Sequence, residues 1–189
     1  MKRIFAAIKI YPSDQFFQIY SELKSSCKYD RINWVQPYQI HVTLKFFGET
    51  EEALISEIQK NLREIADRYP PFELILREIG IFGSYYKPRV IWVGIEKNET
   101  LASLANEILV RMENLGFEKD RQNFVPHLTI GRIKYTDNKQ LFQQAIERYK
   151  SQFIQEQRVG EFYLIESKLS TKGPTYSIIE SYPLKKGSS

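Results

Sequence analysis

The sequence predicts an α+β fold in a single domain, and three observations support this prediction. Strand-like and helix-like segments follow one another in mixed order, without the regular strand–helix repeat of a doubly wound sheet. The glycine-rich turn that such a sheet carries after its first strand is missing. No long linker interrupts the 189 residues. We therefore expect residues 1–184 to form one domain and residues 185–189 to be a disordered tail.

Strands are predicted where runs rich in β-branched and aromatic residues end at turn residues. Seven segments fit this pattern: residues 3–10, 40–47, 72–82, 89–95, 126–133, 153–169 and 175–182. Gly48 is expected to close the second strand, and a turn at 171–174 should separate the last two. The polar and aromatic loop 83–88 would join the third strand to the fourth.

Helices are predicted where apolar residues recur three and four positions apart. Four segments show this spacing: residues 13–26, 50–69, 100–114 and 138–149. Ser13 and Thr50 are placed to cap the first two helices, and Gly116 is placed to end the third. In the fourth helix the residues expected to face inward are Leu141, Phe142, Ala145 and Ile146.

The composition is that of an ordinary globular protein, with 42% hydrophobic and 26% charged residues, which argues against disorder. The apolar run at residues 4–8 is too short to cross a bilayer, and the start lacks the pattern of a secretory signal. A single cysteine, Cys27, cannot form an internal disulfide, so we expect the reducing cytoplasm. Cys27 also has no histidine near it in the sequence, which argues against a catalytic thiol.

The charge is mildly positive and evenly spread. The chain has 27 basic and 23 acidic side chains, which gives a net charge of +4 and a pI near 9.0. There is no basic tail and no acidic arm. This balance permits a polyanionic partner without requiring one.

The chain has only two histidines, and both stand in the same local pattern. His41 begins His-Val-Thr-Leu and His127 begins His-Leu-Thr-Ile, each at the start of a predicted strand. With seven threonines in 189 residues, coincidence is a poor explanation for this repeat. Residues two apart on a strand share one face, so each motif presents an imidazole beside the hydroxyl of Thr43 or Thr129.

Two such motifs facing each other across a cleft would supply the groups that hydrolyse a phosphodiester without a metal. A neutral imidazole can accept a proton from water while a protonated one donates to the leaving oxygen. The threonine hydroxyls can bind the anionic oxygens between them. One alternative is a structural role for each histidine, which the duplication argues against. The other is a metal site, for which the pair lacks the spacing of a helical zinc motif and any cysteine cluster.

The paired motifs resemble those of the two-histidine phosphoesterase superfamily, which is defined by His-x-Thr-x repeats. The sequence is most similar to its RNA 2′,3′-cyclic phosphodiesterases, historically called 2′-5′ RNA ligases. The similarity includes the blocks at residues 41–48, 87–94, 124–132 and 166–174, and it spans nearly the whole chain. It implies a bilobal molecule, in which two pseudo-symmetric lobes with antiparallel sheets face a central cleft and helices lie outside.

By this resemblance the protein would hydrolyse RNA 2′,3′-cyclic phosphate ends to 2′-phosphomonoesters, with no metal and no cofactor. His41 would protonate the departing O3′, His127 would activate the attacking water, and the two threonines would hold the phosphate. The implied partner is RNA, including tRNA fragments; we expect no membrane partner and a monomer. Three alternatives stay open: 2′-5′ ligation of tRNA halves, hydrolysis of another small cyclic phosphodiester, and a module that binds RNA ends or a nucleotide without turnover.

Phe46 and Arg132, each five residues after a histidine, form a candidate base-binding pair. An aromatic ring and a guanidinium could sandwich a terminal base. This arrangement is similar to that of family members. However, an odd offset on a regular strand places both side chains opposite the histidines. Gly48 and Gly131 would have to mark bends or bulges that redirect them. Otherwise Phe46 belongs to the core and Arg132 is a solvated edge residue.

A second aromatic and basic group lies in the predicted hairpin loop. Tyr85, Tyr86, Lys87 and Arg89 would line an RNA entrance or form a solvated hairpin tip. The pattern favours neither.

Overall fold

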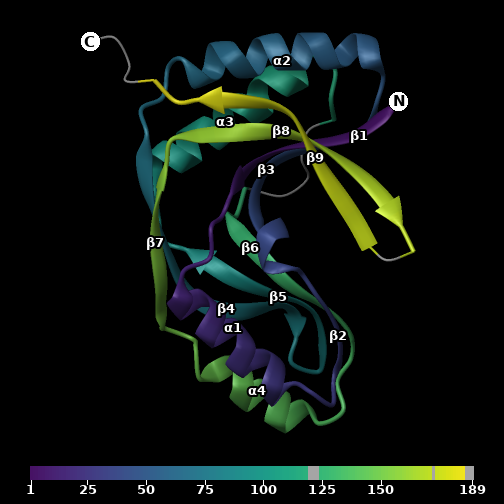
Figure 1. Cartoon of the computed structure of the whole chain (residues 1–189), viewed down its shortest axis with the longest axis vertical. Helices are drawn as coiled ribbons and strands as arrows, with labels where there is room; N and C mark the ends of the chain where they lie inside the picture. Colours follow the sequence, from purple (N-terminus) through teal and green to yellow (C-terminus); the bar gives the residue numbers. More distant parts are fainter. Residues whose placement is uncertain (119–123, 172, 186–189) are drawn as a thin grey trace.

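The computed structural model describes residues 1–118, 124–171 and 173–185. Within these residues the chain forms four α-helices, one 3-10 helix and a strongly curled antiparallel sheet of nine strands (Figure 1). The α+β class predicted from the sequence is confirmed.

The strands are β1 (Lys2–Lys9), β2 (Arg31–Trp34), β3 (His41–Thr50), β4 (Phe72–Ser84), β5 (Lys87–Ile95), β6 (His127–Tyr135), β7 (Phe153–Val159), β8 (Glu161–Ser170) and β9 (Gly173–Pro183). The helices are α1 (Asp14–Ser26), the 3-10 helix η1 (Pro37–Gln39), α2 (Glu52–Ala66), α3 (Glu99–Asn114) and α4 (Lys139–Glu147). None of the helices in the described ranges has the length and apolarity needed to span a membrane.

The sheet has two halves that meet at the strands carrying the histidines. Its order is β7-β4-β5-β6-β3-β1-β8-β9, with β2 paired to β6. Helices α1 and α4 lie in one half of the molecule and α2 and α3 in the other (Figure 1). Val42 of β3 pairs with Leu128 of β6 and joins the halves. The prediction of a separate sheet in each lobe is therefore wrong, because this pairing merges them into one sheet.

The apolar core lies mainly between the sheet and the helices and connects both halves. In β1, Ile4, Ala6 and Ile8 belong to this core. The alternate residues Phe5 and Ala7 belong to a small cluster with β8 on the other face of the sheet. Strand β1 is therefore buried on both faces, which explains its continuous apolar sequence.

Most predicted helix ends agree with the structure. The Ser13 hydroxyl accepts a hydrogen bond from the first turn of α1, and Gly116, with φ of +93°, follows the end of α3. The prediction that Thr50 caps α2 is wrong. Its hydroxyl donates to the carbonyl of Gly48, and α2 begins after Glu51 without a side-chain cap.

Three other expectations need correction. Strand β2 was not predicted, because four residues carry little periodic signal. The single strand expected at 153–169 divides at Gly160 into β7 and β8, which lie in different halves of the sheet. Leu141, expected to face inward, is 58% exposed, because only a narrow stripe of α4 is buried.

The expected tail begins with an ordered residue. The backbone N–H of Lys185 donates to the carbonyl of Ala66, and its ammonium lies 2.6 Å from the Asp67 carboxylate. The remaining residues of the predicted tail, 186–189, lie outside the described residues.

Candidate active site

The pairing of β3 with β6 brings the two His-x-Thr motifs together. Val42 and Leu128 are fully buried and face each other in the register. Side chains alternate along a strand, so the flanking histidines and threonines lie on the opposite face of the sheet. The structure thus places His41, Thr43, His127 and Thr129 around one cavity, as the sequence predicts.

Both imidazoles are anchored in the same way. The His41 Nδ1 atom lies 2.7 Å from the carbonyl oxygen of Gln39, and the His127 Nδ1 atom lies 2.8 Å from that of Val125. A carbonyl oxygen can only accept a hydrogen bond, so each Nδ1 carries the proton. The neutral form of each ring therefore has a free Nε2 lone pair with which to accept a proton.

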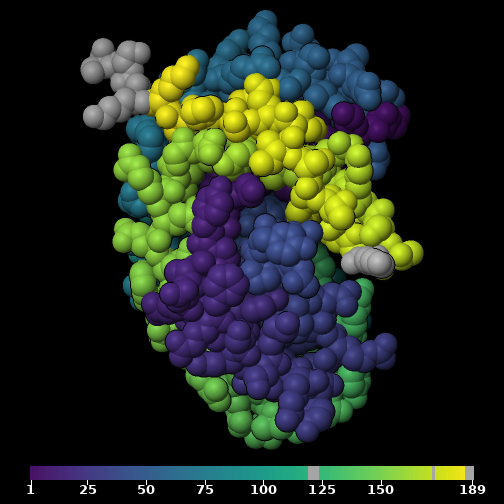
Figure 2. Space-filling view, viewed as in Figure 1, coloured from purple at the N-terminus to yellow at the C-terminus, as the bar shows by residue number. Residues whose placement is uncertain are grey.

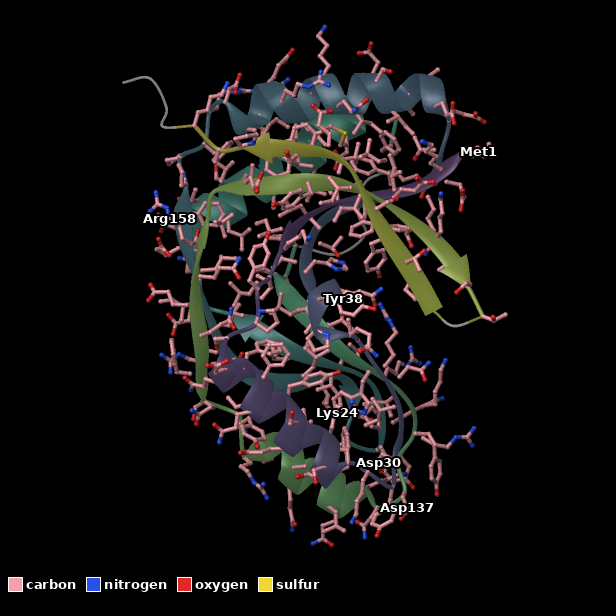
Figure 3. All side chains as sticks on the ribbon, viewed as in Figure 1. Met1, Lys24, Asp30, Tyr38, Asp137 and Arg158 are labelled. Carbon is pink, nitrogen blue, oxygen red and sulfur yellow. The ribbon has the colours of Figure 1, made fainter. Side chains whose placement is uncertain are left out.

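The shared cavity has a volume of about 880 Å³, within the range of small-molecule sites. It is bounded by β2, η1, the starts of β3 and β6, and the tip of the β8–β9 hairpin. The side-chain amide of Gln39 donates to the Pro174 carbonyl at 2.9 Å, which ties η1 to β9. Figure 3 shows Tyr38 of η1 in this central region.

His41 lies in an aromatic enclosure. Its ring centroid is 4.9 Å from that of Phe5 and 5.5 Å from that of Tyr176. Burial lowers the pKa of His41 below its ordinary value, and the nearby Arg132 guanidinium lowers it further, whereas the hydrogen bond to Gln39 raises it. The imidazole is therefore neutral at pH 7 in the free protein.

His127 has a different neighbour. The Phe82 ring stands perpendicular to it at a centroid distance of 4.8 Å, and Trp92 lies 5.7 Å behind Phe82. Gly80 makes room for the indole, because a Cβ atom at that position would lie 2.2 Å from the Trp92 ring. Strands β4 and β5 thus support one face of His127.

Bulges in β3 and β6 resolve the parity problem at Phe46 and Arg132. The register between β1 and β3 shifts opposite Leu44, so the consecutive residues Leu44 and Lys45 are both buried. Phe46 consequently returns to the face of the histidines and is 46% exposed. This bulge precedes Gly48, so Gly48 is not what redirects Phe46.

In β6 the corresponding shift lies opposite Ile130, next to Gly131 as predicted. Ile130 and Gly131 are both buried, and Arg132 emerges on the cavity face. A side chain at Gly131 would meet Ile32 of β2 at 2.9 Å, so the glycine also permits β2 to pack closely.

The two members of the candidate base-binding pair have different surroundings. Arg132 lines the cavity with the histidines. Phe46 is not among the described residues that line it; instead the Arg3 guanidinium carbon lies 4.7 Å from the centroid of the Phe46 ring. The Arg3 side chain therefore covers the Phe46 ring.

The remaining sequence candidates lie outside this cavity. Cys27 is buried, and burial raises the pKa of its thiol to about 12 with a further contribution from Asp30, so it is a poor nucleophile. The Tyr85 hydroxyl donates to Glu147 of α4 at 2.6 Å. Tyr86 is 81% exposed. The described part of the chain holds no cluster of three histidine, cysteine or acidic side chains placed to bind a metal.

Sequence reasoning missed the residues that surround the imidazoles. Gln39 precedes His41 by two positions. Its carbonyl can be expected beside the imidazole only if the chain is assumed to turn before the strand. Tyr176 follows the Gly-Pro of the fourth similar block, which was a usable signal. Phe5 and Phe82 carry no local signal, because they reach the site through strand pairing alone.

Comparison with known proteins places this arrangement in a family. A model of the 2′-5′ RNA ligase superfamily matches residues 12–170. An RNA 2′,3′-cyclic phosphodiesterase of Aquifex aeolicus is 33% identical over 187 residues, covering 97% of this chain and 99% of the relative. A protein of the same name from Methanothermobacter thermautotrophicus is 33% identical over 171 residues, covering 90% and 91%.

Solved structures show the same fold. A crystal structure of a Thermus thermophilus protein superposes with a TM-score of 0.80 at 25% identity, covering 96% of this chain and 97% of that one. E. coli LigT complexed with 3′-AMP gives a TM-score of 0.72 at 21% identity, covering 98% and 99%.

A curled antiparallel sheet that brings two His-x-Thr motifs into one cavity defines a two-histidine phosphoesterase. The chain belongs to the 2′-5′ RNA ligase superfamily, and it is an enzyme of the phosphodiesterase class.

Proposed function

We propose that the protein hydrolyses the 2′,3′-cyclic phosphate ends of RNA to 2′-phosphomonoesters. The observation that carries this proposal is one cavity holding two imidazoles anchored alike, two threonine hydroxyls and the Arg132 guanidinium. The imidazoles can act as a proton acceptor and a proton donor, and the other three groups can donate hydrogen bonds to phosphate oxygens. The name shared by relatives that cover nearly the whole chain supports the same activity.

The reaction needs one proton accepted and one donated. Water attacks phosphorus and gives its proton to Nε2 of His127, the P–O3′ bond breaks, and Nε2 of His41 protonates O3′. The product carries a 2′-phosphate and a free 3′-hydroxyl, and the histidines then exchange protons with solvent. Because burial keeps free His41 neutral, the acid role requires the anionic substrate to raise its pKa.

Turnover of a 2′,3′-cyclic mononucleotide in EDTA tests the activity and its metal independence together. We expect a 2′-phosphate product and a bell-shaped pH dependence of kcat/KM, because one imidazole must be neutral and the other protonated. Loss of activity on chelation, restored by a divalent ion, would overturn the two-histidine mechanism.

A substrate with sulfur at the bridging 3′ position separates the two roles. A thiolate leaves without protonation, so His41→Ala should lose about 10²- to 10⁴-fold on the oxygen substrate and recover most of this on the sulfur substrate. His127→Ala should stay impaired on both, because water still requires activation. Rescue of His127→Ala instead would reverse the assignment.

Ligation is a second candidate activity. A ribose hydroxyl in place of water would form a 2′-5′ linkage through the same groups, and the family description includes this reaction. The third possibility, binding without turnover, has less support, because it gives no reason for two matched Nδ1 anchors.

We also infer that residues 1–184 act as one monomeric, bilobal domain in the cytoplasm. The connected core supports the single domain. The successions β3-α2 and β6-α4 begin at the two histidine motifs, one in each half, which supports a pseudo-symmetric relation between the halves.

A further inference from the structure

A second cavity, of about 480 Å³, opens on the β1 side of His41. It is lined from β1, η1, β8 and β9, and it shares Tyr38, His41 and Tyr176 with the main cavity. In Figure 2 the surface is hollowed between the yellow strand β9 and the blue segment that precedes β3. The two cavities therefore adjoin at His41.

Lys9 is a basic residue that lines this second cavity, and it also lines a neighbouring cavity together with Tyr11 and Tyr163. It lies directly opposite His41 in the β1–β3 register, so the two side chains share one face with Cα atoms about 4.5–5.5 Å apart. The Lys9 ammonium is 6.0 Å from the ring centroid of Tyr11 and 5.7 Å from that of Tyr163. No carboxylate within the described ranges forms an ion pair with it.

The backbone around Lys9 is held in place by strand β7. The Gln157 side chain donates to the Lys9 carbonyl at 2.9 Å and accepts from the Tyr11 N–H at 2.8 Å. A cation whose backbone is held beside a catalytic group is suited to one phosphodiester of a chain rather than to diffuse attraction.

Tyr38 provides an aromatic surface where the two cavities meet. Its side chain is 74% exposed, whereas its neighbour Gln39 is fixed through bonds to His41 and Pro174. An exposed ring on a rigid turn can stack on a base of any identity.

We propose that this second cavity binds the penultimate nucleotide of a single-stranded RNA end. The phosphodiester that joins it to the terminal nucleotide lies at Lys9, and its base stacks on Tyr38. The inference rests on the proposed function, which places the terminal ribose at His41. A second subsite makes an oligonucleotide a better substrate than a mononucleotide, with little preference for the identity of the penultimate base.

The test compares kcat/KM for a 2′,3′-cyclic dinucleotide with that for a 2′,3′-cyclic mononucleotide. For the wild type we expect the dinucleotide to be favoured by about 50-fold or more. Lys9→Gln should reduce this preference by about 10-fold with little change on the mononucleotide, and Lys9→Arg should retain it. The log–log salt dependence should be steeper for the dinucleotide by about 0.7, the value for one extra phosphate contact, and Lys9→Gln should remove that difference.

Tyr38→Ala tests the stacking surface. It should lower the preference for the dinucleotide by about 5- to 100-fold, the range for one base–aromatic stack, whereas Tyr38→Phe should preserve it. Lys24→Gln is the matched control for Lys9→Gln. Lys24 also lies over a tyrosine ring, at 5.5 Å from that of Tyr20, but it is on α1, away from Tyr38 (Figure 3).

The outcomes separate this inference from the proposed function. No turnover of either substrate by the wild type would contradict the proposed function. Turnover of both without a preference for the dinucleotide, or equal losses on both substrates in Lys9→Gln, would overturn the second subsite and leave the cyclic phosphodiesterase activity standing.

Discussion

The two histidines share an anchor but differ in their surroundings. Each Nδ1 donates to the carbonyl two residues earlier, at 2.7 and 2.8 Å, so both present the same nitrogen to the cavity. His41 is enclosed by Phe5 and Tyr176, and Phe82 contacts His127. The motif therefore predicts which atoms react, whereas the proton affinity of His41 depends on strands distant in the sequence.

We expect the His41 imidazole to titrate below 6.5 in the free protein, because burial and the Arg132 charge both disfavour its protonation. Arg132→Gln should raise this pKa by removing a positive charge, and inorganic phosphate bound in the cavity should raise it by adding a negative one. NMR titration of the imidazole resonances between pH 5 and 8 measures the His41 pKa in the wild type, in Arg132→Gln and in the presence of phosphate. A His41 pKa that does not respond to Arg132→Gln would contradict the proximity of the two groups.

The same shift has a consequence for stability. The unfolded chain binds the His41 proton more tightly than the folded protein, so this group lowers the free energy of unfolding as the pH falls below about 6.5. Between pH 7 and 5, stability should therefore fall more steeply in the wild type than in His41→Gln. Urea unfolding at each pH measures this free energy. If it falls equally with pH in the two proteins, His41 is not desolvated.

Thr43→Val and Thr129→Val remove a hydroxyl while keeping a β-branched strand former. Both positions line the cavity, so each variant should lose about 10²-fold in kcat with a 2′,3′-cyclic nucleotide, the lower range for one oriented donor. Their free energies of unfolding should change by less than about 1 kcal/mol. Thr100→Val on α3 is the control, and wild-type rates in both cavity variants would remove the threonines from the mechanism.

At the scale of elements, the bulges decide which residues reach the site. Period-two alternation predicts that Phe46 and Arg132 face away from the histidines. The extra residues Leu44 in β3 and Ile130 in β6 reverse that outcome. Gly131 hinted at a bulge in β6, but nothing in the sequence around Leu44 signals one, because a bulge there depends on how β1 pairs with β3.

Gly80→Ala tests the support that β4 and β5 give to His127. The added Cβ would lie 2.2 Å from the Trp92 ring, and the displaced indole would push Phe82 toward the imidazole. We expect a loss of about 1–3 kcal/mol in the free energy of unfolding together with a lower kcat.

Gly160→Ala is the matched control for this substitution, because a Cβ at Gly160 meets no atom within 4 Å. It should leave both the free energy of unfolding and kcat nearly unchanged. If Gly80→Ala also had no effect on kcat at a temperature where it is folded, the indole would have no role in positioning His127.

At the scale of the whole molecule, local patterns predict the order of elements but not how the sheet closes. The helices and most strands follow from apolar spacing, caps and glycine or proline punctuation. The merging of two half-sheets does not, because it depends on a single backbone pairing between Val42 and Leu128. The division at Gly160 was also missed, because this single glycine is the only turn residue between β7 and β8 and the two strands separate only when the sheet curls.

The curl is held by side chains as well as by backbone pairing. Strand β7 is one edge of the sheet, yet its Gln155 reaches the linker that follows β1. This side chain accepts from the Ser13 N–H at 2.8 Å and donates to the Tyr11 carbonyl at 3.2 Å, and it is only 4% exposed. Two backbone groups near the cap of α1 thus depend on one buried amide.

Gln155→Ala should therefore destabilise the whole molecule without disabling its chemistry. Losing the hydrogen bonds to these two part-buried groups costs about 1–3 kcal/mol, which urea unfolding would measure. The histidine motifs lie on β3 and β6, so kcat on a cyclic mononucleotide should stay within about threefold of the wild type at a temperature where the variant is folded, since only substitutions that move the reacting groups change it strongly. An unchanged free energy of unfolding would mean that water replaces the amide and that the edge strand does not hold the curl. A large loss of kcat in the folded variant would show instead that closure of the sheet at β7 sets the spacing of the two imidazoles.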